Sequence, residues 1–414
     1  MPSLRSKISA GVAVLGFARA VAAADPAAQA TNELGIDLYR QFASGSGNVC
    51  LSPYSISCAL AMTLSGADGE TRAEMSRVMH VTGDVDSSFG ALQQALAKSA
   101  DETKNIAAQA KSRGGPKEPI IFSVADRLFP QSGYKLRDEF VRRVQEHYGA
   151  APEPLDFAKN GAGATKRIND WVAEQTHDRI RDLIPSPLDA ASRLVLANAL
   201  YFKAAWSKEF TPEATTPEPF HVNGSEPVDV PTMLATRECR YAKTNDYTAV
   251  GLPYIGGEFQ LLILLPREVN GLTELEKKLN ADVFAVKLEN AELDLHMPKF
   301  TFSPETMPLA QKLQALGMQS AFDQPPGSAN FDRMAARSPN DYLFISEVFH
   351  KTFIAVDEKG TEAAAATAVA MMAGSAVIEK PEPIEVKIDH PFIFAIQHVP
   401  SGACLFLGRV TDPR

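Results

Sequence analysis

Strand-like apolar runs crowd the second half of this chain of 414 residues, whereas helical spacing of apolar residues marks most of its first half. We expect helices over 31–42, 54–64, 140–148 and 164–183. Gly, Pro, Asn and Asp separate many of the strand-like runs, and we expect strands over 121–128, 194–202, 248–254, 259–266, 293–302, 343–356, 384–388, 391–399 and 403–410. Because helices and strands do not alternate regularly, the pattern predicts an α+β fold rather than a doubly wound one. The continuously apolar run at 194–202 indicates a sheet buried on both faces.

One segment between two strand-like runs is typical of neither class: residues 358–374 read EKGTEAAAATAVAMMAG. Alanine is the best helix former, so propensity alone predicts a helix there. The segment has little polar face, however, and with the residues that follow it makes an unusually long connection, which is usually functional or disordered. An Ala-rich surface helix or linker is the alternative. A second stretch, 106–118, contains Gly114-Gly115-Pro116 and is predicted to be a loop or an insertion.

Composition argues against several classes of partner. The net charge is −9 at pH 7 and Lys and Arg are scattered, which argues against binding to nucleic acid. No run of about 20 apolar residues follows the N-terminus, so we expect no membrane partner. The four cysteines lack metal-ligand spacing, and we expect no metal and no cofactor. Buried free thiols are the main interpretation, with a disulfide from Cys50 or Cys58 to Cys404 as the alternative.

Residues 1–24 have the pattern of an export signal. Arg5 and Lys7 precede an apolar stretch, and small residues before Asp25 offer a cleavage site. We therefore expect a signal peptide over 1–24, a mature domain over 25–414, and a secreted or extracellular protein, periplasmic in a bacterium. A disordered Ala-rich N-terminus is the alternative. Asn223 begins a glycosylation sequon, although Asn-Gly is first of all a hairpin turn signal.

A series of ordered motifs across residues 31–413 resembles the serpin family. The segment that starts at Glu358 is similar to the family's reactive-loop hinge, which has an acidic residue, a variable residue, Gly, Thr or Ser, Glu and then small residues. The other motifs occur in family order: NVCLSPYSISCALAMTLSGADGET (48–71), NALYFKAAW (198–206), PKF (298–300), SEVFHKTFIAV (346–356), DHPFIF (389–394) and GRVTDP (408–413). Asp126, Ala204 and Ala355 depart from the family pattern, which has a common Asn, a usual Gly and an often acidic residue at these positions.

This resemblance implies a single large domain with three β-sheets, about eight or nine helices and an exposed reactive-centre loop at about 358–382. It also implies a suicide inhibitor of serine proteases, with papain-like cysteine proteases as a second target class. In the family, a protease cleaves the loop and forms an acyl-enzyme, and the cut loop inserts into the main sheet and traps the covalent complex. The chain would then be a monomer whose partner is a protease, and it would not be an enzyme.

The resemblance also assigns three sets of site residues. The hinge is Glu358, Gly360, Thr361, Glu362, Ala363, Ala364, Ala365 and Ala366. The polar cluster beneath the main sheet, called the shutter, is Ser52, Ser55, Asn198 and His350. The region where insertion begins, called the breach, is Trp206, Lys299 and Glu358, and an ion pair is expected between the last two. For the shutter residues and Trp206, an ordinary buried polar group or simple core packing is the alternative.

The hinge composition suits a strand that enters a sheet, because successive side chains of a strand point to opposite faces. The inward side chains would be mostly small: Thr361, Ala363, Ala365, Thr367, Val369 and Met371. No Pro interrupts 358–374, so every backbone N–H can join a ladder. Glu362 begins the opposite face, where we expect its side chain to remain in solvent.

The expected scissile bond is Gly374–Ser375. In the family the cleaved bond follows the seventeenth residue counted from the hinge glutamate, here Glu358; Met372 and Ala373 are alternates. The surrounding residues are small and apolar and include no Arg or Lys, so a trypsin-like pocket should find no basic side chain there. An elastase-like or subtilisin-like target is therefore expected.

Two other functions stay open. The sequence has no G-x-S-x-G, H-E-x-x-H, P-loop or G-x-G-x-x-G, although an enzyme site can also assemble only in three dimensions. A non-inhibitory serpin acting as a carrier, storage protein or chaperone is the second alternative. Bulky, charged or Pro residues in the hinge would favour it, whereas Thr361 and the four alanines favour insertion.

Overall fold

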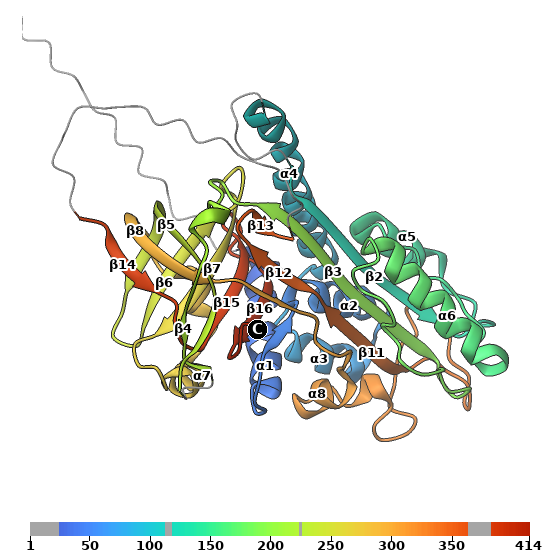
Figure 1. The fold of residues 1–414 in the computed structure, drawn as a ribbon. Helices are drawn as coiled ribbons and strands as arrows, with labels where there is room; N and C mark the ends of the chain where they lie inside the picture. Colours follow the sequence, from blue (N-terminus) through green and yellow to red (C-terminus); the bar gives the residue numbers. More distant parts are fainter. Residues whose placement is uncertain (1–24, 112–117, 223–225, 363–381) are drawn as a thin grey trace, which may run out of the picture.

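A computed structural model of the protein describes residues 25–111, 118–222, 226–362 and 382–414. The expected export signal over 1–24, the sequon at Asn223, the expected hinge alanines 363–366 and the expected cleavage region 372–375 lie outside these residues. Within the described residues the chain forms eight α-helices (Figure 1): α1 Pro26–Phe42, α2 Pro53–Gly66, α3 Gly69–Val78, α4 Val85–Lys111, α5 Asp138–Tyr148, α6 Phe157–Gln175, α7 Leu272–Lys278 and α8 Ala310–Ala315.

The first two helices begin where side-chain caps satisfy their free N–H groups. Asp25 caps α1, because its Oδ1 accepts hydrogen bonds from the backbone N–H groups of Ala27 and Ala28, at 2.9 and 3.1 Å. Ser52 caps α2, because its Oγ accepts the N–H of Ser55 at 3.2 Å. A proline follows each cap at the start of the helix, where its missing N–H costs little.

Two sequence predictions place the end of a helix wrongly. The stretch 106–118 was expected to be a loop, but α4 continues to Lys111, since Ala, Gln and Lys are strong helix formers. The expected helix over 164–183 starts earlier and ends at Gln175, because His177 and Asp178 adopt left-handed backbone conformations, with φ of 50° and 62°. The apolar residues Ile180 and Leu183 beyond that point are buried, but they lie in the irregular segment 176–183 and not in a helix.

The main sheet has seven strands: β2 Ile121–Pro130, β3 Leu194–Ala205, β9 Phe300–Phe302, β10 Met307–Pro308, β11 Ile345–Thr352, β12 Ile354–Asp357 and β13 Gly360–Thr361. β2 pairs antiparallel with one edge of β3. The other edge of β3 pairs in parallel with β11 over residues 194–200 and antiparallel with β13 at residues 204–205.

The second sheet has nine strands: β1 Val49–Leu51, β4 Thr216–Phe220, β5 Val228–Lys243, β6 Tyr247–Pro253, β7 Phe259–Pro266, β8 Glu289–Pro298, β14 Ile384–Lys387, β15 Phe392–His398 and β16 Cys404–Val410. The described residues therefore form two hydrogen-bonded sheets where three were expected. The reason is β5, whose 16 residues pair with β4 at one end, with β6 at the other and with β8 between. One continuous strand thus joins what would otherwise be two separate sheets.

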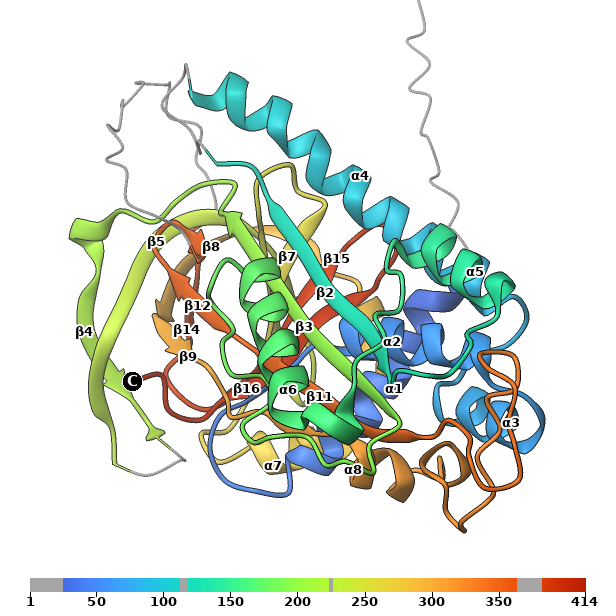
Figure 2. The ribbon, with the colours of Figure 1, turned by 90° about the vertical axis from the view of Figure 1, so that its right-hand side faces the viewer.

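The main sheet is covered on both faces, as the run at 194–202 predicts. Every residue of β3 except Lys203 is buried. On one face, α6 lies across β2 and β3 (Figure 2), and Trp171 and Val172 of α6 pack with Phe129 and Val195 of these strands. The other face packs against α2 in the main core.

The four cysteines are unpaired and buried, so the structure has the free thiols of the main interpretation. Burial raises the pKa of Cys50 to about 12, which keeps this thiol protonated and unreactive at neutral pH. Within the described ranges, no helix is both long enough and apolar enough to cross a membrane.

Candidate functional site

The hinge enters the main sheet at its upper end (Figure 1). Gly360 and Thr361 of β13 pair with Ala205 and Ala204 of β3 on one side, and with residues 356–357 of β12 on the other. Both pairings are antiparallel. Lower in the sheet nothing separates β3 from β11, which pair directly. At the upper end of the sheet, β13 therefore lies between β3 and β12, whereas β3 and β11 pair directly below it.

Gly360 is required by this close approach. Its φ is 155°, and a Cβ at this position would lie 2.0 Å from the carbonyl oxygen of Ala204. Real side chains do not tolerate such a contact, so only glycine lets the hinge backbone reach β3.

Thr361 occupies a buried polar site beside two aromatic rings. The residue is 2% exposed, and its hydroxyl lies 2.6 Å from that of Tyr254. The Tyr254 ring stacks on Trp206, with ring centroids 4.7 Å apart and planes 6° apart. Trp206 in turn donates from its indole Nε1 to the carbonyl of Asp357 at 2.9 Å, and from its backbone N–H to Lys359 at 2.8 Å. The predicted breach residue Trp206 thus holds the turn that precedes β13.

Lys299 and Glu358 form the ion pair that the resemblance implies. The Lys299 Nζ lies 3.0 Å from Oε1 and 2.9 Å from Oε2 of Glu358. The Thr215 hydroxyl donates a further hydrogen bond to Glu358 at 2.8 Å. Burial opposes ionisation of Glu358, but these hydrogen bonds hold the pKa of the carboxyl below its usual value. Glu358 is therefore ionised at neutral pH and pairs with the positive charge of Lys299.

Glu362 does not remain in solvent, contrary to the expectation from alternation. Its side chain is only 9% exposed and pairs with the Nε of Arg179, in the segment 176–183 that follows α6. This segment covers the outer face of the sheet at that level, which alternation along the strand alone cannot reveal. Burial raises the pKa of Glu362, and Arg179 partly offsets that effect. Burial and the neighbouring Glu362 carboxylate also raise the pKa of Tyr201 to about 12.

The four shutter residues come together between α2 and the main sheet. The backbone N–H of Ser52 donates to Nε2 of His350 at 2.9 Å, so this ring nitrogen must be unprotonated. The other ring nitrogen, Nδ1, then donates to Oδ1 of Asn198, its cross-strand neighbour. Burial lowers the pKa of His350 to about 3, consistent with a neutral ring. Asn198 also donates to Ser55 at 2.6 Å, which ties β3 to the start of α2.

Asp126 of β2 completes this cluster, although only its departure from the family pattern drew attention to it in the sequence. Its Oδ1 accepts hydrogen bonds from Ser55 at 2.7 Å and Asn198 at 2.6 Å. Its Oδ2 is buried without a hydrogen-bond partner among the described residues. Burial raises the pKa of Asp126 well above its usual range, while the two hydrogen bonds oppose that shift. The cluster therefore spans α2, β2, β3 and β11, and it bridges the adjacent strands β3 and β11.

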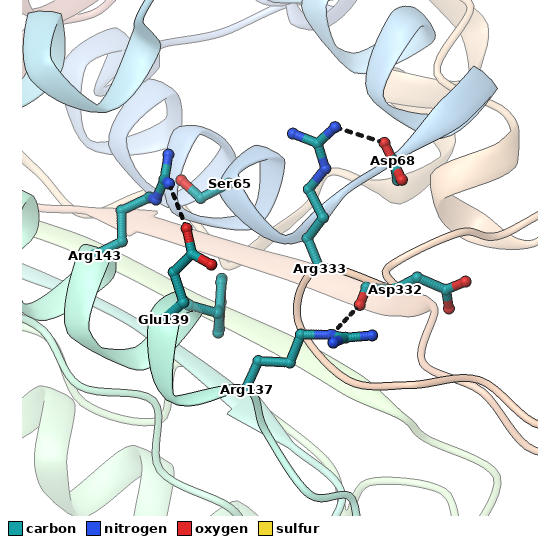
Figure 3. Close-up of a pocket in the computed structure, with 8 residues that line it drawn as sticks. Ser65, Asp68, Arg137, Glu139, Arg143, Asp332 and Arg333 are labelled. Carbon is teal, nitrogen blue, oxygen red and sulfur yellow. Dashed lines mark hydrogen bonds and ion pairs between the residues drawn. The ribbon is translucent and has the colours of Figure 1, made fainter.

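A separate pocket of about 390 Å³ is lined by residues of α2 and α5, by Asp68 and by residues 332–333, and its three arginines donate to acceptors within the lining (Figure 3). Arg143 donates to Glu139 at 3.0 Å and Arg333 to Asp68 at 2.8 Å, while Arg137 donates to the backbone carbonyl of Asp332. Across the described ranges, no group of three or more His, Cys, Asp or Glu is placed to hold a metal ion.

The architecture defines the class of protein: an α+β domain whose main sheet is parted at one end and holds the first residues of a long connection. Residues 29–413 match the family described as Serpin (serine protease inhibitor). The chain therefore belongs to the serpin family.

Individual relatives are similar to this chain over most of its length. An uncharacterized serpin-like protein of Thermococcus kodakarensis is 39% identical over 393 residues, which cover 94% of this chain and 86% of the relative. The leukocyte elastase inhibitor of Sus scrofa is 37% identical over 401 residues, covering 93% and 98%. Among solved structures, Serpin48 of the insect Tenebrio molitor has a TM-score of 0.79 at 31% identity, covering 94% of this chain and 98% of the other.

Proposed function

We propose that this serpin is a suicide inhibitor of serine proteases, whose cleaved reactive-centre loop enters the main sheet and traps the acyl-enzyme. The observation that carries the proposal is β13, because Gly360 and Thr361 already lie between β3 and β12. A strand that continues from Thr361 would pass next between β3 and β11. The similarity to proteins named leukocyte elastase inhibitors supports protease inhibition in general.

The chemistry of the trap belongs to the protease. Its serine attacks the carbonyl of Gly374, an acyl bond forms, and the peptide bond to Ser375 breaks so that the new amino terminus leaves. Insertion of the freed strand then competes with hydrolysis of the acyl bond. Each 1.4 kcal/mol by which the insertion barrier differs from the hydrolysis barrier changes the ratio of the two rates about tenfold. A hinge that has already entered the sheet favours insertion.

The target class follows from the residues around the bond. Residues 371–377 read MMAGSAV, which offers small and apolar side chains and no positive charge. An elastase-like or subtilisin-like pocket accepts such residues, whereas a trypsin-like pocket carries a carboxylate that requires a basic partner. Lys380 is followed by Pro381 and is expected to resist cleavage.

The test is a panel of elastase-like, subtilisin-like, trypsin-like and papain-like proteases, each incubated with the purified protein. We expect an SDS-stable complex with an elastase-like or subtilisin-like enzyme, and a mass consistent with acylation at Gly374, or at Met372 or Ala373. A stable complex with trypsin joined through Lys380 would contradict the target class. Cleavage throughout the panel without any complex would favour a non-inhibitory serpin that acts as a carrier, storage protein or chaperone.

We further propose that the protein is exported and loses residues 1–24. Asp25 supports this site, because it caps α1 and would stay with the mature chain, so cleavage would leave the cap side chain in place. The N-terminal sequence of protein recovered from outside the producing cell should begin near Asp25. An intact N-terminus on that protein would contradict the proposal.

A further inference from the structure

Strained backbone gathers in one part of the structure, the segment 176–183 between α6 and β3. Six residues other than glycine have positive φ in the described ranges, and three of them are His177, Asp178 and Asp182, with φ of 50°, 62° and 51°. A fourth is Glu362, with φ of 50°, whose side chain pairs with this segment. Left-handed backbone costs free energy in residues other than glycine, and such residues cluster at switch regions and functional sites. This concentration of strain indicates that the segment has a functional role.

Both ends of the segment are fixed to α6. At the end of α6, the N–H and the hydroxyl of Thr176 donate to the carbonyl of Val172 at 3.0 and 2.7 Å. Beyond the segment, the side-chain amide of Asn169 accepts the N–H of Ile184 at 2.8 Å and donates to its carbonyl at 2.9 Å. The segment and α6 therefore form one unit, which we call the α6 unit and which lies across β2 and β3 (Figure 2).

The α6 unit contacts the main sheet on both sides of the line along which β3 and β11 pair, which we call the seam. On the β3 side, the ring of His177 packs against the ring of Tyr201, with centroids 5.1 Å apart. On the β11 side, the Nζ of Lys351 donates to the backbone carbonyl of Arg181 at 2.9 Å. The α6 unit therefore reaches from one strand of the seam to the other.

Entry of a further strand at the seam is incompatible with holding both strands in this way. Neighbouring strands of a sheet lie about 4.8 Å apart, so an inserted strand moves β11 away from β3 by about that distance. The hydrogen bond from Lys351 to Arg181 is 2.9 Å long, and it cannot survive such a displacement while the α6 unit stays on β3. This bond must therefore break before or while the seam opens.

We propose that the α6 unit is a clasp that delays strand insertion, and that Lys351 is the residue that fastens it to β11. This inference rests on the proposed function, in which the form with the inserted strand is the more stable one. Only a kinetic barrier then keeps the loop of the uncut protein outside the sheet. The clasp supplies part of that barrier, so it prolongs the active lifetime of the uncut protein and slows insertion after cleavage.

The test compares the purified wild-type protein with Lys351→Met, which keeps most of the side chain but removes its donor. Hydrogen exchange of residues 194–200 and 345–352 in the uncut protein reports opening of the seam and does not depend on inhibition. We expect about tenfold faster exchange in Lys351→Met, because a charge-assisted hydrogen bond across the seam is lost. After one cut in the loop, its melting temperature should rise about tenfold sooner than that of wild type. The uncut variant should also lose inhibitory activity about tenfold faster on mild heating.

Two further variants keep the result interpretable. Lys351→Arg retains a donor for the same carbonyl and should restore wild-type rates, and Lys277→Met removes an exposed lysine of α7 and should leave them unchanged. Wild-type rates in Lys351→Met, or rates in Lys351→Arg as fast as in Lys351→Met, would overturn the clasp. If cut wild type showed no rise in melting temperature, the proposed function would fail, whereas faster exchange in uncut Lys351→Met would still show that Lys351 fastens the seam.

Discussion

Thr361 lies in a site that fits a small polar side chain, since it is 2% exposed and its hydroxyl meets that of Tyr254 at 2.6 Å. We predict that Thr361→Arg folds with the hinge outside the sheet, is cleaved at the same bond and behaves mainly as a substrate. An unpaired charge entering this site costs several kcal/mol, and the cost falls at the start of insertion. The ratio of SDS-stable complex to cleaved product should fall at least about tenfold against one responsive protease.

Thr361→Val is the matched control, because it keeps the shape of the side chain and removes only the hydroxyl. Its complex yield should remain close to that of wild type. If Thr361→Arg gave the same complex yield as wild type, this residue would not be the first to insert.

Asp126 makes the stability of the folded protein depend on pH. An unfolded aspartate ionises near pH 4, whereas burial raises the pKa of Asp126 in the folded protein. Above about pH 4 the folded state therefore keeps a proton that the unfolded state has lost. Stability then falls by up to about 1.4 kcal/mol per pH unit until the folded group also ionises.

Asp126→Asn removes this dependence, so its stability relative to wild type should increase as the pH rises from 4 toward 7. His350 acts in the opposite direction: burial lowers its folded pKa to about 3, so its contribution is lost as the pH falls below about 6.5. Because His350 is present in both proteins, it cancels in the difference between their melting temperatures. A difference that stays constant from pH 4 to pH 8 would show that Asp126 is ionised in the folded state.

At the scale of single residues, the family motifs predicted the residues that form and hold the turn before β13, but not the residues that pack around β13. Trp206, Lys299 and Glu358 lie within motifs, and they meet in space. Tyr254 and Arg179 were missed, since each is far from the hinge along the chain and neither has a distinctive local pattern. Only the tertiary packing identifies them, because it brings the Tyr254 hydroxyl to Thr361 and the Arg179 guanidinium to Glu362.

At the scale of elements, the segment 176–183 lies over the hinge through the contact between Arg179 and Glu362. We predict that Arg179→Met loosens β13, because it leaves a nearly buried carboxylate without its cation. The backbone N–H of Glu362, which donates to the carbonyl of Ala355 at 2.8 Å, should then exchange with solvent about tenfold faster. Mass spectrometry of the peptide that contains residues 360–362 measures this rate.

Two variants separate this effect from a general disturbance of the segment. Arg181→Met removes an exposed charge nearby and should leave the exchange rate unchanged. Adding Glu362→Gln to Arg179→Met removes the buried charge, and slow exchange should return in large part. Unchanged exchange in Arg179→Met would mean that the ion pair does not hold the hinge.

The elements most easily predicted are those buried on both faces. β3 and β7 appear in the sequence as continuous apolar runs, because every side chain meets the core. β5 was not predicted, since it alternates buried and exposed residues, includes Pro231 and carries charges along its length. Its role in joining two sheets depends on pairing partners that are distant in sequence, and local patterns do not contain that information.

At the scale of the whole molecule, the proposed inhibition requires an exchange of strand pairings in the main sheet. β3 and β11 now form a parallel ladder over residues 194–200, held at its middle by Asn198 and His350. A strand inserted beyond Thr361 would replace this one ladder with two antiparallel ladders, and each added hydrogen bond contributes roughly 1 kcal/mol. It would also bury the alternate small side chains that begin with Thr361. The intact protein is therefore expected to be less stable than its cleaved form.

The most direct measurement compares the thermal unfolding of intact protein with that of protein cut once in the loop by a protease that is not trapped. We predict a sharp rise in melting temperature after cleavage, since the inserted strand adds burial and ladder hydrogen bonds. The hinge variant Thr361→Arg, cleaved in the same way, should show a smaller rise. Identical melting temperatures for cut and intact wild type would show that the loop does not insert, and would contradict the proposed inhibitory mechanism.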